Sequence, residues 1–103
     1  MSNLLPLVEE LADSETHAAR ADWLLQVPDG VVLRDFGAIR IILLGAGFLL
    51  GVDFLHLRHA ALHATRFKDG ELPPAVLDAV RRGRKVMVDV ALGKAAAGEG
   101  QAE

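Results

Sequence analysis

The feature that most constrains the fold is the apolar stretch of residues 36 to 66, which carries almost no charge in its first half. Between Asp35 and Asp53 the sequence has one charged residue, Arg40. Residues 48 to 66, placed at about 100° per residue, form a helix with two apolar stripes on roughly opposite sides. A surface helix of a monomer needs only one apolar face. We therefore expect this helix to be buried on both sides, as the centre of a small bundle or with one side against another subunit.

The two stripes differ in their histidines. The first stripe is purely apolar and consists of Leu50, Phe54, Leu57, Ala61 and Ala64. The second contains or borders three histidines. A chain of 103 residues has a marginal core, and a twofold homodimer is the commonest way to bury surplus apolar surface. We therefore predict that the second stripe contacts a second copy or another protein, through Phe48, Val52, Leu55, His56, His59, Leu62 and His63. The alternative is a monomer that buries both stripes itself.

A transmembrane helix is not favoured. The uncharged run from Ile41 to Val52 includes Gly47 and Gly51, at a spacing that lets helices approach closely in lipid. The run has only twelve residues, whereas a span needs about 20. Extending it to Phe36 would place Arg40 inside the bilayer.

The remaining segments also favour helices. Residues 3–26 have an apolar stripe at helical spacing, with Ser14 as a candidate N-cap that would divide them into two shorter helices. Residues 27–30 form a turn, and helices are expected over 31–44, from 48 to about 66, and from 72 to 92. The sequence predicts one all-α domain over residues 1–92, with about four helices in a bundle or in an orthogonal array of helix-turn-helix character. Residues 93–103 are expected to form a disordered tail.

The histidines raise the question of a metal site. His59 and His63 are four residues apart, so they can bind one metal ion from a single helical turn. No glutamate stands between them to act as a general base, and the only distant third ligand is His17, with Asp13 one turn before it. Histidines can also cover the rim of an apolar interface. We expect no metal and no cofactor, and keep His59, His63 and His17 as the candidate ligands.

A basic run in the last predicted helix is the second candidate site. Arg81, Arg82, Arg84 and Lys85 could neutralise phosphates of a nucleic acid. The whole chain has a net charge of −3, and no aromatic side chain accompanies the run. Asp78 and Asp89 can pair with these cations one turn away. Nucleic-acid binding is therefore an alternative function.

The sequence contains no catalytic signature. It lacks cysteine, and its N-terminus lacks the basic and apolar regions of a signal peptide, so we expect a cytoplasmic protein. Residues 1–30 carry a net charge of −5, which could meet a basic partner. We interpret the chain as a non-enzymatic helical interaction protein, such as an adaptor, inhibitor or assembly factor, that acts as a homodimer through protein–protein contacts. Nucleic-acid binding by the basic helix and metal binding by the histidine helix are the two alternatives.

Overall fold

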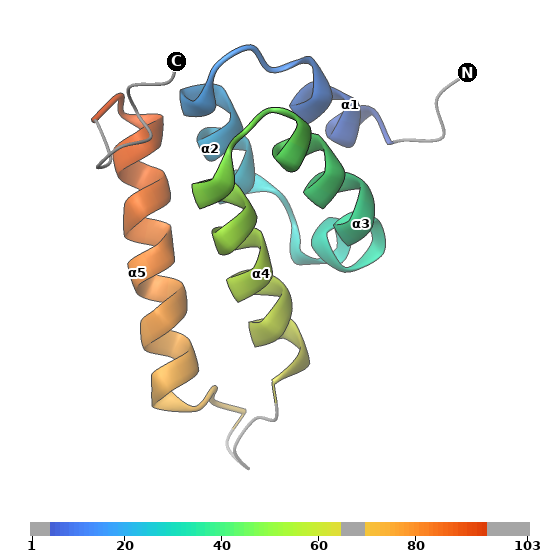
Figure 1. Cartoon of the computed structure of the whole chain (residues 1–103). Coiled ribbons are helices and arrows are strands. Elements are labelled where there is room, and N and C mark those ends of the chain that lie inside the picture. The colour runs from blue at the N-terminus through green and yellow to red at the C-terminus, as the bar shows by residue number, and fades with distance from the viewer. Residues whose placement is uncertain (1–4, 65–69, 95–103) are drawn as a thin grey trace.

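The computed structural model describes residues 5–64 and 70–94, which form five α-helices and no strand (Figure 1). This confirms the predicted all-α class, with one helix more than expected. The helices are α1 Pro6–Asp13, α2 His17–Gln26, α3 Asp29–Gly45, α4 Leu49–His63 and α5 Pro74–Ala91. No helix in these two segments is long and apolar enough to cross a membrane.

The first predicted helix is divided in two, but the cap is Thr16 and not Ser14. Ser14 has an extended backbone with φ −65° and ψ 135°, which ends α1. Its hydroxyl donates back to the carbonyl oxygen of Glu10 at 2.9 Å. Thr16 Oγ1 accepts a hydrogen bond from the backbone N–H of Ala19 at 3.1 Å and so caps α2.

Consecutive helices from α2 to α5 run in opposite directions along the molecule (Figure 1). α4 packs between α3 and α5, α2 packs against α5, and α1 packs against α3. The turn from α3 to α4 uses Gly47 at φ 73°, a conformation that favours glycine. α4 ends at His63, before the predicted end at Arg66, which lies outside the described residues. Residues 95–103 of the predicted tail also lie outside them.

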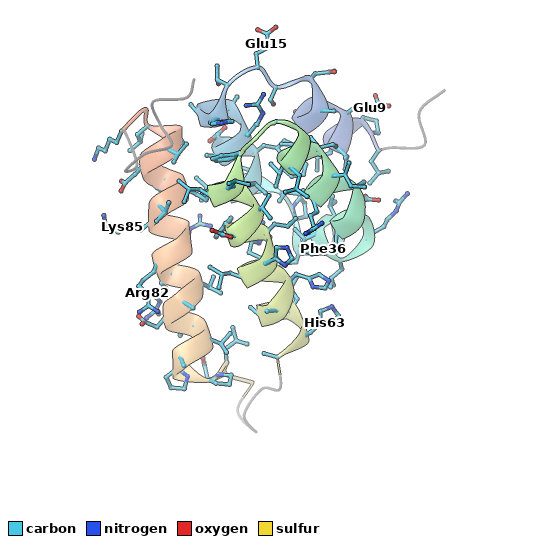
Figure 2. The ribbon with its side chains drawn as sticks, viewed as in Figure 1. Glu9, Glu15, Phe36, His63, Arg82 and Lys85 are labelled. Atoms are coloured by element: carbon cyan, nitrogen blue, oxygen red, sulfur yellow. The ribbon has the colours of Figure 1, made fainter. Side chains whose placement is uncertain are left out.

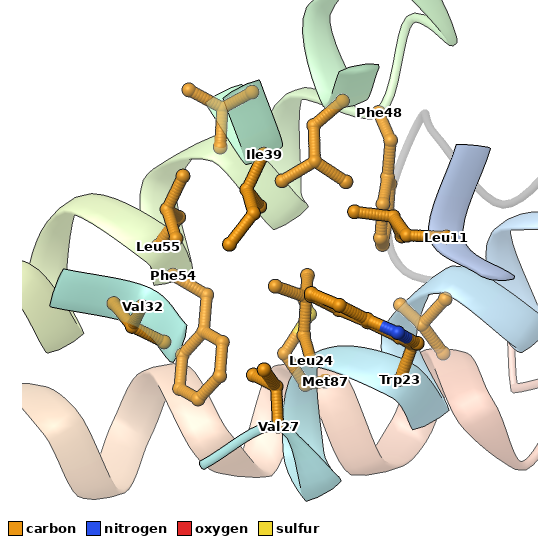
Figure 3. Close-up of a cluster of buried hydrophobic side chains, with 14 of the residues drawn as sticks. Leu11, Trp23, Leu24, Val27, Val32, Ile39, Phe48, Phe54, Leu55 and Met87 are labelled. Carbon is orange, nitrogen blue, oxygen red and sulfur yellow. The ribbon is translucent and has the colours of Figure 1, made fainter. Parts of the chain in front are cut away.

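The core lies where the five helices meet (Figure 3). Every helix contributes at least one buried side chain, among them Leu11 from α1, Leu24 from α2, Ile39 from α3, Leu55 from α4 and Met87 from α5. These five side chains are all fully shielded from solvent. Burying one such side chain contributes about 1.5–3 kcal/mol, so the core holds the short helices in place.

Helices of the same chain bury the centre of each apolar stripe of α4. Phe54 and Ala61 of the first stripe and Phe48, Val52 and Leu55 of the second are buried, whereas Leu50, Leu57 and Leu62 are half-buried. The first stripe faces α5, where a side chain at Gly83 would meet Leu57 Cδ1 at 2.9 Å and Phe54 Cδ1 at 3.1 Å. Glycine at this position therefore lets α4 and α5 approach closely. The second stripe enters the core through Phe48, Val52 and Leu55.

Candidate functional site

The predicted interface on α4 needs correction at three positions. Phe48 and Leu55 are 0% exposed and Val52 is 7% exposed. Phe48 stacks on the ring of His17 in α2, with 4.5 Å between ring centroids. Because α2, α3 and α4 of one chain already bury these side chains, they cannot form the surface that meets a partner.

The other four predicted interface residues lie closer to the surface. His56 and His63 are exposed, and His59 and Leu62 are half-buried. Leu62 packs against the core. The three histidines therefore remain at the surface of α4, as the rim of the stripe whose centre is buried.

The exposed face of α4 is a separate stripe. It consists of residues at steps of four, three, four and three, which is the spacing of one helix face. All of them are solvent-exposed: Leu49, Asp53, His56, Ala60 and His63. Beside them on α3 lie the exposed residues Gly37, Arg40 and Leu44. We call these eight residues, with the half-buried Phe36 and His59 between the two helices, the α3–α4 surface.

Contacts between aromatic rings and one hydrogen bond from an arginine connect α3 to α4 across this surface. The ring of Phe36 lies 4.0 Å from that of His59 and 5.4 Å from that of His56, measured between centroids. Arg40 Nε donates a hydrogen bond to His56 Nε2 at 3.1 Å. The rings of His59 and His63 lie 4.5 Å apart. Figure 2 shows Phe36 and His63 on these neighbouring helices.

Large apolar side chains are exposed on α3 and at its turn into α4. Leu44 and Leu49 flank the turn between α3 and α4 and are 40% and 59% exposed. Ile41 and Leu33 on α3 are 69% and 46% exposed. Sequence reasoning missed these residues as surface, because a continuous apolar run gives no signal of which of its side chains stay outside.

The structure does not bring the candidate metal ligands together in one chain. His17 is 6% exposed, and its Nδ1 accepts a hydrogen bond from Arg20 Nη1 at 2.7 Å. It stacks on Phe48, eleven residues before His59, which is about 16 Å of helix rise. Within residues 5–64 and 70–94, no three His, Asp or Glu side chains could hold one metal ion.

The basic run lies on the outer side of α5. Arg81, Arg82, Arg84 and Lys85 are all exposed. Figure 2 shows Lys85 on the side of α5 that faces away from α4, whereas Arg82 also lines the groove between the two helices. Arg82 pairs with Asp78, and Lys85 Nζ lies 3.6 Å from Asp89 Oδ2. Two of the four cations are therefore partly neutralised within the helix.

Two grooves lie beside other helices, and the first shares Asp53 with the α3–α4 surface. One of about 320 Å³ between α4 and α5 is mostly apolar, with Asp53 and Arg82 among its lining residues. Another of about 490 Å³ lies along α1 and α2, beside Trp23, Glu10 and Asp22.

Comparison with protein-family models, with curated proteins and with solved structures gives no match to this chain. A function can therefore be inferred only from its residues and their geometry.

Proposed function

We propose that the chain is a non-enzymatic interaction protein of the cytoplasm that forms a homodimer through the α3–α4 surface. The observation that carries this proposal is the exposure of Leu44 and Leu49, at 40% and 59%, on a surface that also holds three surface histidines. Apolar side chains that gather at one place on a surface mark interaction sites. The proposal moves the predicted interface from the buried stripe of α4 to its exposed neighbour.

A twofold dimer would bury each of these side chains twice. Removing about half of a leucine side chain from water contributes about 1 kcal/mol. In a twofold interface the same patch occurs on both subunits, so Leu44 and Leu49 together contribute about 4 kcal/mol before the cost of association. Further contacts of Ala60 and the histidine rings add to this.

The charges of the exposed α4 stripe favour a second copy as the occupant. Asp53 lies toward the N-terminal end of the stripe, and His63 lies at its C-terminal end. Two such helices packed antiparallel bring the acidic end of each beside the histidine end of the other. Opposite ends of the helix dipoles are then also adjacent, which is favourable. The stripe is thus complementary to itself in the twofold arrangement.

The test is the solution molar mass, measured by size exclusion with light scattering in buffer with a chelator. We expect a dimer for the natural chain and a monomer for Leu49→Glu, because the carboxylate would be buried in the interface. The matched control is Leu92→Glu at the end of α5, where the leucine is 67% exposed but lies outside the α3–α4 surface. Circular dichroism should show that both variants keep the helical fold.

A natural chain that is monomeric at the highest concentration measured would contradict the proposal. Dimerisation that survives Leu49→Glu but not Leu92→Glu would move the interface to α5.

A second candidate function is nucleic-acid binding by α5. It is supported by the exposure of four cations within five positions, Arg81, Arg82, Arg84 and Lys85. The pairing of Arg82 and Lys85 with aspartates speaks for a solvated face instead.

A further inference from the structure

We propose that the groove along α1 and α2 binds a basic peptide segment of a partner protein, whose cationic side chains contact Glu10 and Asp22. The groove is lined by residues of α1, of α2 and of the turns that follow them. It shares no residue with the α3–α4 surface. The inference therefore adds a second interaction surface and does not rest on the homodimer.

The lining of the groove is mostly apolar and suits the stem of a long basic side chain. Leu7 on α1 is half-buried, and Pro28 after α2 is exposed. Trp23 is 8% exposed, and its Nε1 donates a hydrogen bond to the carbonyl oxygen of Leu7 at 2.8 Å. This bond fixes the indole against α1. Lysine and arginine bury their methylene stems along apolar surface of this kind and keep the charged group in water.

Carboxylates supply the charge of the groove, one from each helix. Glu10 on α1 and Asp22 on α2 are exposed, and none of the nine lining residues is a lysine, arginine or histidine. Gln26 Nε2 donates a hydrogen bond to Asp22 Oδ2 at 2.8 Å, which orients that carboxylate. Neither Glu10 nor Asp22 forms an ion pair within residues 5–64 and 70–94. Both acids can therefore pair with a cation from outside the chain.

The charge around the groove is also negative. Residues 6–26 carry five carboxylates and one arginine. That arginine, Arg20, donates to the carbonyl oxygen of Ser14 at 2.8 Å and bonds to the His17 ring, and it lines another pocket beside α3. In the described part of the chain, none of the five carboxylates belongs to an ion pair. Charge complementarity therefore favours a basic partner and opposes a nucleic acid at this site.

A peptide matches the groove better than a free cation does. An arginine guanidinium has five N–H donors in one plane, so it can pair with carboxylates that stand on two different helices. Apolar side chains of the same peptide can cover Leu7 and Pro28, which a polyamine cannot do. A metal ion is not favoured, because no three His, Asp or Glu side chains in residues 5–64 and 70–94 could hold one.

The experiment titrates the full chain with a blocked octapeptide of alternating arginine and leucine, and follows the emission of Trp23, the only tryptophan of the chain. We expect saturable binding that shifts this emission, because the indole lines the groove. The same peptide with glutamate in place of arginine should not bind. Isothermal titration calorimetry gives the dissociation constant independently.

Two double variants locate the site. Glu10→Gln/Asp22→Asn preserves the shape of both side chains and should weaken binding about tenfold or more, because it removes two charge-assisted contacts. Glu9→Gln/Asp13→Asn is the matched control, since it removes the same charge from the neighbouring face of α1, outside the groove. It should weaken binding about threefold or less, through the general field alone. Circular dichroism should show the natural helix content in both variants.

Three outcomes would overturn the proposal. The arginine peptide could fail to bind, or the two double variants could weaken binding equally, and either result would leave no role for the groove. Spermine that binds as tightly as the arginine peptide would show that charge alone is recognised. Because the readout is peptide binding and not molar mass, the result does not depend on whether the chain is a monomer or a dimer.

Discussion

Arg58 of α4 lies with its Nη2 atom 2.6 Å from Asp29 Oδ1 at the start of α3. The same guanidinium donates to the carbonyl oxygens of Leu24 at 2.8 Å and Val27 at 2.9 Å. These carbonyls belong to the last turn and C-cap of α2, where no intrahelical donor is left. One side chain therefore connects α4 to the end of α2 and to the beginning of α3.

Replacing Arg58 by methionine should destabilise the fold by about 1–3 kcal/mol, because carbonyl groups near the core lose their donor. Urea unfolding followed by circular dichroism measures this. Asp29→Asn is the control. Its carboxylate is 65% exposed, so the ion pair contributes less than about 1 kcal/mol. Equal losses in the two variants would contradict the assigned role of the carbonyl hydrogen bonds.

Two glycines should respond to alanine with opposite sign. At Gly51 a Cβ atom would meet Phe48 Cδ2 at 2.5 Å, and the Phe48 ring is buried and stacked on His17. We expect Gly51→Ala to cost about 1–3 kcal/mol through overpacking. At Gly37 nothing lies within 4 Å, so Gly37→Ala should stabilise the helix by about 0.5–1 kcal/mol.

The two glycine variants are best compared by thermal unfolding in the Leu49→Glu background, so that self-association does not contribute. Stabilisation by Gly51→Ala would mean that the Phe48 ring moves at little cost.

Trp23 should be the main link between α1 and α2. It is 8% exposed, and its Nε1 donates to the carbonyl oxygen of Leu7 at 2.8 Å. Trp23→Phe should lower the free energy of unfolding by about 1–3 kcal/mol, from the lost hydrogen bond and the smaller ring. Gln26→Ala, which removes an exposed hydrogen bond to Asp22 in the same helix, should change it by less than about 0.5 kcal/mol.

The basic face of α5 should bind duplex DNA only weakly. Arg81 and Arg84 have no carboxylate partner in the described residues, whereas Arg82 and Lys85 do. Two free cations give a salt dependence with a slope of about −2. Fluorescence anisotropy with a short duplex at two salt concentrations measures the affinity for DNA and its dependence on salt. If the natural chain bound the duplex with a submicromolar Kd, and Arg81→Glu/Arg84→Glu abolished this binding, nucleic-acid binding would be better supported than homodimerisation as the function.

Helical periodicity was enough to predict the all-α class and the burial of α4 on both sides. The pattern shows on which side of a helix an apolar side chain lies, but it does not show which other segment buries that side chain. Phe48 and Leu55 were therefore assigned to a partner, although α2 and α3 cover them within the chain. The correct cap of α2 was also ambiguous, because Ser14 and Thr16 lie two residues apart and both can cap a helix.

The candidate surface could be predicted only in part. The one-turn spacing of His59 and His63 is visible in the sequence, but the contact of His59 with Phe36 joins residues 23 positions apart. The exposure of Leu44 and Leu49 depends on how tightly α3 and α4 turn at Gly47. α3 is apolar on nearly all sides of its second half, so periodicity does not distinguish its surface from its core.

The kink at Asp35 divides α3 into two segments with different surroundings. Asp35 has φ −112° and ψ 22°, outside the helical range, and its Oδ2 atom is buried without a hydrogen-bond partner among the described residues. Asp29, at the start of the segment before Asp35, pairs with Arg58, and the segment after Asp35 belongs to the surface that we propose for dimerisation. Backbone amides on the two sides of the kink should therefore exchange with solvent at different rates. Only those after Asp35 should slow further when two chains associate.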